Sequence, residues 1–408
     1  MEDILVAIVG AGPSGLATAA CLNSMLIPNI ILEREDCCAS LWKKRAYDRL
    51  KLHLAKRYCA LPLLPHLPTT PKYMSKDTFV CYLDDYASRF NIKPLYNRSV
   101  EHSFYDENEK KWRIEAKNTV SGEMEVYAAK FLVVATGENS QAYVPEVPGL
   151  ESFEGEIVHA SEYKSGLTYG GKKVLVVGCG NSGMEISRDL SDFGAHTSIL
   201  IRSPFHVLTR DMVFLGMKLL QYLPVKTVDS MLLTMAKLVF GNLSKCGIHR
   251  PKQGPFAFKA ATGKTPVIDR GAVEKIQAGE IEVVPDIVNI DGSTVEFKNG
   301  VHKSFDAIIF ATGYKSVAYN WLQDYQHVLE ADGLPKYKYP NLWRGEKRLY
   351  CAGMLGKGLA GVSSDAKSIA HDIAKIINAK RKMRSSRKGP QGKVFANAFI
   401  SKFRRLWF

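Results

Sequence analysis

The first stretch of the chain alternates short apolar runs with a glycine-rich turn. Ile4–Val9 is a continuous apolar run, as expected for a parallel strand that is buried on both faces. After the turn comes Leu16–Met25, whose small and apolar residues favour a helix. Asn29–Leu32 is a second apolar run, and it ends at the acidic Glu33. The pattern predicts a βαβ unit of about 30 residues.

The same pattern returns later in the chain. Lys173–Val177 and Thr197–Ile201 predict strands on either side of a helix over Met184–Phe193. The glycine turns of the two units begin at Gly10 and Gly178, 168 residues apart. This internal repeat predicts two similar α/β domains.

The remaining regions predict the elements around these two units. Phe131–Val134 and Ala307–Phe310 are strands of the buried type, and each is followed by Ala-Thr-Gly. Ser75–Phe90 predicts an amphipathic helix with a serine cap, and Val100–Val126 a small antiparallel meander. Residues 204–270 hold apolar stretches broken by lysines. They predict a helical insertion packed on the core, with a membrane-surface element as the alternative.

The first glycine turn has the form G-x-G-x-x-G expected of a dinucleotide site. Its first glycine permits the tight turn, the second lets the backbone approach a pyrophosphate, and the third lets the helix pack close to the strand. The helix N-terminus offers N–H groups and a partial positive charge to the phosphates. Glu33, 23 residues after Gly10, is placed to bind an adenosine ribose. The turn consists of Gly10, Ala11, Gly12, Pro13, Ser14 and Gly15.

The second turn has the same form but a different residue at the end of its second strand. Arg202 stands there instead of an acid. An acid would repel a 2′-phosphate, whereas a guanidinium pairs with it, so this turn predicts NADPH. Two dinucleotide sites in one chain imply hydride transfer from NADPH to a flavin, which assigns FAD to the first turn. The second turn consists of Gly178, Cys179, Gly180, Asn181, Ser182 and Gly183.

The predicted fold is therefore α/β, with two Rossmann-type domains. The NADPH domain is inserted into a discontinuous FAD domain. Residues 1–165 and 300–378 are assigned to the FAD domain, and residues 166–299 to the NADPH domain with its helical insertion at 204–270. Residues 379–408 form a basic C-terminal tail.

Composition narrows the class of protein. The chain has 408 residues, a formal net charge of +14 and eight cysteines. Residues 375–405 contain no acid, so much of the charge belongs to the tail and argues against a nucleic-acid surface. The cysteines have no C-x-x-C spacing, which predicts no metal site and a reduced, cytoplasmic compartment. Adjacent Cys37 and Cys38 are poorly suited to a redox disulfide. Among flavin enzymes, disulfide reductases are therefore less favoured than other flavin reductases and monooxygenases.

One segment between the two turns carries a family resemblance. Phe153–Tyr163 matches F-x-G-x-x-x-H-x-x-x-[FY] and is similar to the identifying sequence of the flavin-containing monooxygenases and their Baeyer–Villiger relatives. Leu41–Leu54, Ala311–Ser316 and Asp365-Ala366 resemble the plant YUCCA branch of that family. The resemblance implies FAD, NADPH, O₂ and a C4a-(hydro)peroxyflavin. For the YUCCA branch it implies conversion of indole-3-pyruvate to indole-3-acetate, a step of auxin biosynthesis.

The resemblance also suggests roles for single residues. Asn139, just after the first Ala-Thr-Gly, and Lys56 are the candidate catalytic residues, with Asn139 near the flavin or nicotinamide and Lys56 near an anionic substrate or phosphate. Trp42 and His53 are expected at the cofactor, His53 where animal members carry an Asn near the flavin. His159 of the motif is expected to shape the link between domains or to be purely structural. Arg45 is a second candidate for an anionic group.

Two other functions stay open at this stage. One is N- or S-oxygenation of amines, sulfides or thioethers, and the other is an FAD-binding redox sensor or interaction protein. The basic tail combines Lys380-Arg381-Lys382 with aromatic and apolar residues further on. It is either disordered or a peripheral contact with an anionic membrane, which would place the protein at the cytosolic face of the endoplasmic reticulum. The apolar residues are Phe395, Phe399, Phe403, Leu406, Trp407 and Phe408.

Overall fold

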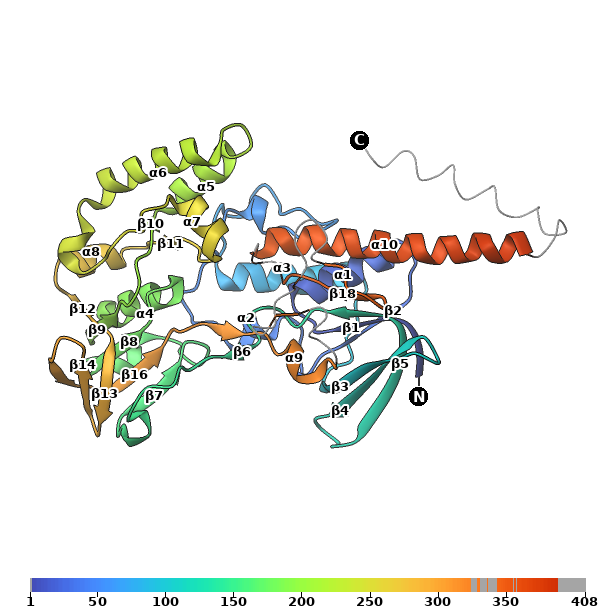
Figure 1. The fold of residues 1–408 in the computed structure, drawn as a ribbon, viewed down its shortest axis with the longest axis horizontal. Coiled ribbons are helices and arrows are strands. Elements are labelled where there is room, and N and C mark those ends of the chain that lie inside the picture. The colour runs from blue at the N-terminus through green and yellow to red at the C-terminus, as the bar shows by residue number, and fades with distance from the viewer. Residues whose placement is uncertain are drawn as a thin grey trace.

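The computed structural model has two lobes that lie side by side (Figure 1). It describes residues 2–323, 329–330, 336, 343–354, 356 and 358–387, the last eight by their backbone alone. Within that part of the chain no helix is long and apolar enough to cross a membrane.

The lobe that contains the N-terminus is built on a six-stranded sheet. Strand β1 pairs in parallel with β2 on one side and β5 on the other, β18 adds to β5 in parallel, and β4 and β3 follow as an antiparallel pair. The strands in sheet order are β2 (Asn29–Leu32), β1 (Glu2–Val9), β5 (Met124–Val134), β4 (Lys111–Asn118) and β3 (Arg98–Asp106), with β18 (Leu349–Cys351) beside β5.

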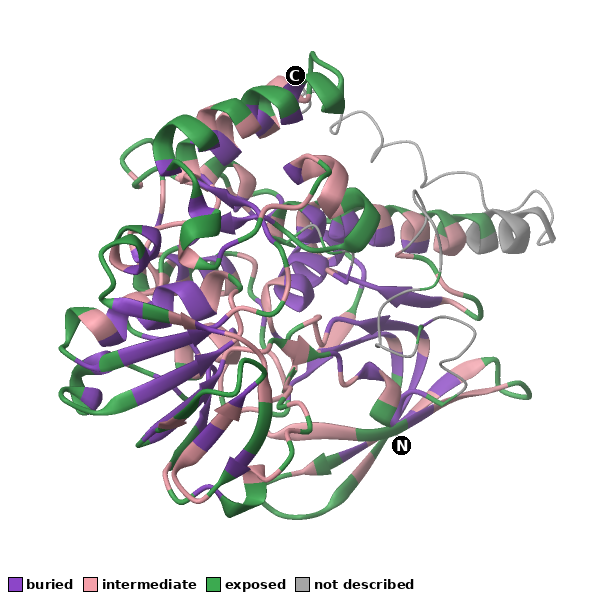
Figure 2. Cartoon of the chain, turned by 60° about the vertical axis from the view of Figure 1, so that its left-hand side comes forward, coloured by how far each residue is buried: buried purple, intermediate pink, exposed green. Residues whose placement is uncertain are grey.

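Helices cover both faces of this sheet, because alternate residues of β1 point to opposite sides. Val6 and Ile8 belong to a core shared with α1, α3 and α10, whereas Ala7 and Val9 belong to a second core that includes α9. The central strands β1 and β5 are largely buried, whereas β3 at the edge is mostly half-buried or exposed (Figure 2). The helices of this lobe are α1 (Pro13–Ser24), α2 (Ser40–Lys44), α3 (Lys76–Arg89), α9 (Ala318–Trp321) and α10 (Gly358–Arg387), with the 3₁₀ turn η1 (Lys56–Tyr58).

The second lobe is built on a five-stranded parallel sheet. Its strands in order are β12 (Ile281–Val284), β9 (His196–Leu200), β8 (Lys173–Val177), β16 (Ala307–Phe310) and β7 (Glu156–His159). A three-stranded antiparallel sheet of β13 (Ile287–Asp291), β14 (Thr294–Phe297) and β15 (His302–Ser304) packs beside it. Its helices and turns are η2 (Leu150–Ser152), η3 (Gly166–Tyr169), α4 (Asn181–Asp192), η4 (Leu243–Cys246) and α8 (Ala272–Gln277).

The internal repeat is confirmed by the sheet order. β1 lies between β2 and β5, and β8 lies between β9 and β16 in the same way. The sheets divide the chain differently from the predicted domain ranges. β7 and β16 lie in the ranges 1–165 and 300–378 that were assigned to the FAD domain, but both pair within the second sheet. The strand before each Ala-Thr-Gly joins the sheet of the glycine turn that precedes it in the chain, so β5 joins β1 although Gly178 is nearer to it in sequence than Gly10.

Several predicted elements appear with shifted ends. Helices α1 and α4 begin inside the glycine turns, at Pro13 and Asn181, because turn and helix start are one structure. Helix α3 begins after Ser75, whose hydroxyl accepts a hydrogen bond from the Thr78 N–H at 3.1 Å, as the predicted cap requires. The meander and the strand predicted at Phe131–Val134 merge, since β5 runs unbroken through both.

The predicted helical insertion is also present. It holds α5 (Arg210–Leu219), α6 (Val225–Phe240) and α7 (Pro255–Thr262), with the short parallel pair of β10 (Val207–Leu208) and β11 (Val267–Ile268). Val228 and Leu232 of α6 are buried in the core of the second lobe, so the packed alternative is the one observed. The predicted tail differs at its start, because α10 continues to Arg387, and residues 388–408 lie outside the described residues.

The chain crosses between the lobes twice, and the two crossings pair. β6 (Gln141–Ala142) leaves the first lobe and β17 (Tyr314–Lys315) returns to it, and the two form an antiparallel pair. The second lobe is therefore inserted into the first through neighbouring connections, as predicted.

Candidate functional site

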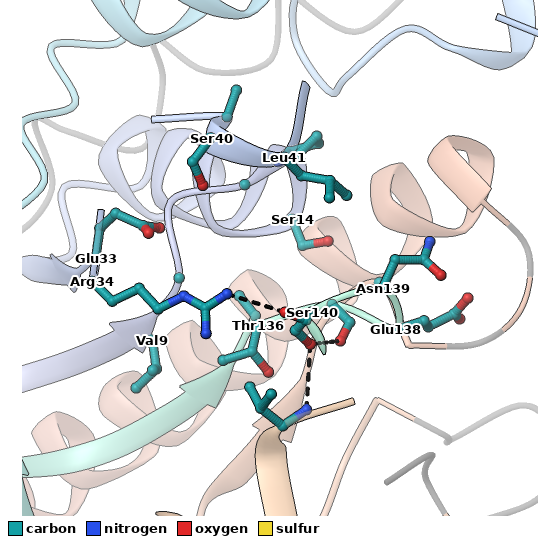
Figure 3. A pocket seen from close by; sticks show the side chains of 18 of the residues that line it. Val9, Ser14, Glu33, Arg34, Ser40, Leu41, Thr136, Glu138, Asn139 and Ser140 are labelled. Carbon is teal, nitrogen blue, oxygen red and sulfur yellow. Dashed lines mark hydrogen bonds between the residues drawn. The ribbon is translucent and has the colours of Figure 1, made fainter. Parts of the chain in front are cut away.

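A cavity of about 410 Å³ opens at the carboxyl ends of β1, β2 and β5 in the first lobe. This edge of an open parallel sheet is where ligands bind in doubly wound folds. Figure 3 shows Glu33 and Ser14 on one side of it and Thr136, Asn139 and Ser140 on the other. The predicted site residues that line it are Gly10, Gly12, Pro13, Ser14, Glu33, Trp42, Arg45 and Asn139.

Each glycine of the first turn is needed for a separate steric reason. A side chain at Gly10, where φ is +106°, would lie 2.7 Å from the Ala135 carbonyl oxygen, and one at Gly15 would lie 1.9 Å from the Gly10 carbonyl oxygen. These two positions allow the strand and helix to pack. A side chain at Gly12 would meet no atom within 4 Å and would point into open space. Gly12 lines the cavity, so this space is available to a pyrophosphate.

Glu33 closes the cavity at the end of β2. It is buried, with one carboxylate oxygen accepting from the Ala11 N–H at 2.6 Å and the other from the Glu35 N–H at 3.0 Å. Burial raises the pKa of Glu33 above its usual value, although both N–H groups favour the charged form. The carboxylate therefore lies beside the glycine turn, where the predicted ribose contact requires it.

Asn139 follows the Ala-Thr-Gly that ends β5, and it lies at the cavity with its neighbours Glu138 and Ser140 (Figure 3). Arg34 donates to the Ser140 carbonyl at 3.0 Å, and the Ser140 hydroxyl donates to the Gly137 carbonyl at 2.8 Å. These bonds fix the loop that presents Asn139. The structure thus places Asn139 where a flavin contact is expected.

Trp42 and Arg45 reach the cavity from the short helix α2. The Trp42 ring packs edge-on against Phe79 of α3, with ring centres 4.8 Å apart. Arg45 pairs with Glu35 at 3.0 Å. Trp42 offers an apolar wall on this side, and Arg45 a positive charge.

The start of α10 completes the cavity, although it lies more than 300 residues along the chain. Gly353, Gly358, Leu359 and Val362 line it. Glu138 accepts a hydrogen bond from the Gly356 N–H, and burial raises the pKa of Glu138. None of these residues was predicted from the sequence. The Asp365-Ala366 signature was the available signal, because buried Asp365 accepts from the Gly353 N–H at 2.9 Å and holds this segment in place.

The second glycine turn repeats the geometry of the first. A side chain at Gly178 would lie 2.6 Å from the Ala311 carbonyl oxygen, and one at Gly183 would lie 1.9 Å from the Gly178 carbonyl oxygen. Gly180, like Gly12, faces open space. The Asn181 side chain accepts from the Ile268 N–H at 2.7 Å and so ties the turn to β11. The backbone of this turn can therefore receive a second pyrophosphate.

Two cations lie near this second turn. Burial raises the pKa of the Cys179 thiol to about 11, and the positive charges of Lys264 and Arg202 oppose the shift. Both side chains are exposed and thus open to a ligand. Arg202 was predicted from its place after β9, whereas Lys264 comes from the helical insertion and was missed.

Replacing Arg202 by alanine tests the role of its charge. We expect Arg202→Ala to weaken NADPH binding by about tenfold or more, the size of one charge-assisted hydrogen bond. NADH binding should stay unchanged, because NADH has no 2′-phosphate. The measurement is the KM for each nucleotide, with Lys172→Ala as the control. Lys172→Ala removes a charge just before β8, at the end of that strand that lies away from the glycine turn. Equal losses for both nucleotides would contradict the assignment.

His53 lies at the contact between the two lobes. It is not among the residues that line the cavity, and its Nε2 lies 2.9 Å from a carboxylate oxygen of Glu185 on α4. Buried Glu185 also accepts from the Tyr47 hydroxyl at 3.0 Å and the Arg270 guanidinium at 2.8 Å. His53 therefore joins a segment of the first lobe to the helix of the second glycine turn. A direct contact of His53 with a cofactor stays a prediction.

Lys56 binds a neighbouring loop of the first lobe. Its ammonium group donates to the carbonyl oxygens of Leu67, Pro68 and Thr70 at 2.9, 2.8 and 2.6 Å. All three donors of the ammonium group are thereby used within one loop. The geometry supports a structural role in place of the expected substrate contact.

Replacing Lys56 by methionine separates these two roles. Lys56→Met should lower the free energy of unfolding by about 1–2 kcal/mol, since it removes hydrogen bonds from a charged group to carbonyls. The kcat should stay close to that of the wild type. Urea unfolding and steady-state kinetics provide the two readouts. A large loss of kcat with unchanged stability would restore the catalytic assignment.

His159 of the identifying motif lies at the end of β7 and is buried. Its Nε2 lies 3.0 Å from the Gly313 carbonyl oxygen and its Nδ1 2.9 Å from the Ser161 hydroxyl. Burial lowers the pKa of His159, so the neutral ring is favoured. Because Gly313 follows β16 and precedes β17, His159 fixes the place where the chain returns to the first lobe.

Comparison with known proteins decides the family. Residues 4–388 match the flavin-binding monooxygenase-like family. The chain belongs to this family. It is 59% identical over 378 residues to the probable indole-3-pyruvate monooxygenase YUCCA10 of Arabidopsis thaliana, covering 92% of this chain and 98% of that protein. It is 47% identical over 371 residues to the indole-3-pyruvate monooxygenase YUCCA1 of Oryza sativa subsp. japonica, covering 90% of each.

Solved structures show the same fold at much lower identity. An oxidized steroid monooxygenase bound to NADP superposes with a TM-score of 0.71 at 18% identity, covering 92% of this chain and 85% of that one. A flavin-containing monooxygenase from Stenotrophomonas maltophilia gives a TM-score of 0.69 at 20% identity, covering 92% and 100%. The protein is thus a flavin monooxygenase with two Rossmann-type domains. The predicted cofactors, FAD and NADPH, agree with the flavin-binding family and with the NADP bound in the steroid monooxygenase. The open space at Gly12 and Gly180 fits one dinucleotide on each turn.

Proposed function

We propose that this flavin monooxygenase converts indole-3-pyruvate, NADPH, O₂ and a proton to indole-3-acetate, CO₂, NADP⁺ and water. The observation that carries the proposal is the identity of 59% over 92% of the chain to a probable indole-3-pyruvate monooxygenase. One oxygen atom enters the new carboxylate and the other leaves as water. The lost carboxyl group becomes CO₂, so atoms and electrons balance.

Each of the residues described above has a binding or positioning role in this reaction. When bound, reduced flavin supplies the electrons that activate O₂. Gly12 and Glu33 bind the dinucleotide that carries the flavin, and Asn139 and Trp42 border the cavity beside it. Gly180 and Arg202 bind NADPH on the second turn. Glu185 joins His53 and Tyr47 of the first lobe to the helix of that turn, and so orients the two sites.

Product analysis tests the proposal. The purified, FAD-loaded protein should form indole-3-acetate from indole-3-pyruvate, with one NADPH consumed for each product molecule. Fast oxidation of a sulfide or amine without indole-3-acetate would favour the N- or S-oxygenating alternative. FAD binding without NADPH turnover would favour a redox sensor.

We also propose that the basic tail attaches the enzyme to an anionic membrane, at the cytosolic face of the endoplasmic reticulum. The support is its composition, since Lys380-Arg381-Lys382 precede a series of aromatic residues. A chain ending at Asn378 should lose binding to vesicles that contain anionic lipid at low salt, and keep its activity. Unchanged vesicle binding would exclude the tail as the anchor.

A further inference from the structure

Aromatic and basic side chains gather between α5 and the loop of residues 56–74. Arg210 and Phe214 come from α5, one helical turn apart and therefore on one face. The guanidinium carbon of Arg210 lies 5.0 Å from the centre of the Tyr73 ring. The rings of Phe214 and Tyr58 meet edge-on, with centres 6.2 Å apart. These four residues, here called the interdomain cluster, join the insertion of the second lobe to a loop of the first.

Two polar groups of the interdomain cluster are buried without a partner. Nε and Nη2 of Arg210 and the hydroxyl of Tyr58 make no hydrogen bond within the described part of the chain. An unpaired buried donor costs about 1–3 kcal/mol, and a charged one more. Burial lowers the pKa of Arg210, and the positive charge of Arg270 acts in the same direction. Buried unpaired groups are rare in native proteins, and a bound water, ion or ligand that completes them is the usual explanation.

The nearby carboxylates are already committed to other cations and donors. Asp211 accepts from Lys72 at 2.7 Å and from the Tyr73 hydroxyl at 3.0 Å. Glu185, whose charge also acts on Arg210, is held by three other side chains as described above. Arg210 is therefore left with open donors that fit an incoming anion.

We propose that the interdomain cluster binds the carboxylate end of the substrate. Arg210 pairs with the carboxylate through its two open N–H groups, Tyr58 donates its hydroxyl, and the rings of Tyr73 and Phe214 contact the aromatic part. A planar guanidinium matches a carboxylate in two parallel hydrogen bonds. The proposal rests on the proposed function, because it requires an aromatic keto acid as the substrate.

Access to Arg210 requires little energy. The ammonium group of Lys72 lies over the Phe214 ring of the cluster, 4.3 Å from its centre, and both Lys72 and Tyr73 are held by Asp211. The Lys72–Asp211 ion pair is exposed, with 49% and 76% of the two side chains accessible. Such pairs contribute about 0–1 kcal/mol, so a substrate can displace this one readily. Arg210 itself stays in place on α5.

The test compares Arg210→Gln with Lys218→Gln, which removes an exposed charge from the same helix. Both are measured as FAD-loaded, full-length enzymes. For Arg210→Gln we expect the KM for indole-3-pyruvate to rise about 10- to 100-fold with little change in kcat. The Kd of indole-3-acetate should rise by the same factor, and that of the uncharged indole-3-acetamide should not. Lys218→Gln should change none of these values.

Further variants and the NADPH reaction complete the test. Arg210→Lys should recover part of the affinity, and Tyr58→Phe should raise the KM a few-fold. An unchanged KM, or equal weakening of indole-3-acetate and its amide, would overturn the proposal. So would a loss confined to flavin reduction by NADPH, because Arg210 would then bind the nucleotide.

Failure of the proposed function gives a different result. The wild type would then form no indole-3-acetate, while the binding comparison would still decide the role of Arg210. A loss of affinity in Arg210→Gln that is selective for the carboxylate would support the site. Wild-type enzyme that binds neither indole-3-acetate nor its amide would overturn it.

Discussion

Gly12→Val should yield a folded protein that contains almost no FAD. The φ of Gly12 is −72°, which any residue adopts, and a side chain there meets no protein atom within 4 Å. The valine instead fills the space at the N-terminus of α1 where the pyrophosphate must lie. We expect FAD affinity to fall at least about 100-fold, because two or more charge-assisted hydrogen bonds of about 1.5–3 kcal/mol each are lost. Flavin absorbance of the purified protein and circular dichroism measure the two parts of this expectation.

Gly180→Val is the matched control, since Gly180 holds the same position in the second turn and also faces open space. This variant should keep its flavin and lose flavin reduction by NADPH, whereas dithionite should still reduce it. Together the two variants assign one cofactor to each turn. A Gly12→Val protein with its full complement of FAD would contradict the assignment.

Glu185→Gln should weaken both stability and communication between the cofactor sites. Glu185 is buried and binds His53, Tyr47 and Arg270, so its loss leaves Arg270 without its charge partner in a site that is only 15% exposed. We expect the free energy of unfolding to fall by about 3 kcal/mol. Flavin reduction by NADPH should slow at least about tenfold, because a small displacement of one lobe misplaces the hydride donor. Urea unfolding and stopped-flow reduction measure these effects.

The pH dependence of stability shows whether the charge of Glu185 causes the loss in Glu185→Gln. Burial opposes that charge, but the hydrogen bond and charge of His53 and the charge of Arg270 outweigh burial and hold the pKa of Glu185 below 4.5. Its stabilisation is therefore complete above the unfolded-state pKa and is lost as the pH falls through the lower folded-state value. The difference in stability between the wild type and Glu185→Gln should shrink between about pH 5 and pH 3.

Asp192→Asn is the control for Glu185→Gln. Asp192 lies on the same helix and pairs with Arg49, Arg188 and Lys275, but its side chain is 32% exposed. It should cost about 1 kcal/mol or less. Equal losses for the two variants would show that Glu185 has no special role.

The sequence predicted those parts of the fold that depend on local pattern. The two glycine turns, Glu33 and the cap at Ser75 are each recognised from a short stretch of sequence, and the structure places each of them in the predicted element. Trp42 and Asn139 came from the family resemblance and from the strand end, and both line the cavity.

Contacts between distant segments could not be predicted in this way. The start of α10 reaches the first cavity only because β18 adds to β5, and a pairing of that kind leaves no local pattern. Lys56 and His53 are polar residues of an irregular stretch. Lys56 binds a loop of its own lobe, whereas His53 binds a helix of the other lobe. Whether such residues meet a ligand or a carbonyl depends on tertiary packing.

The pairing of β6 with β17 has a consequence for how this architecture is assembled. Ala142 lies opposite Tyr314, so the chain enters and leaves the second lobe at points that are one strand spacing, about 5 Å, apart. An inserted domain with adjacent ends replaces a short hairpin turn of its host without displacing the flanking strands. The second lobe is thus inserted at the turn of a hairpin formed by β6 and β17. A chain that joined these two strands directly by a short turn would retain an uninterrupted flavin domain.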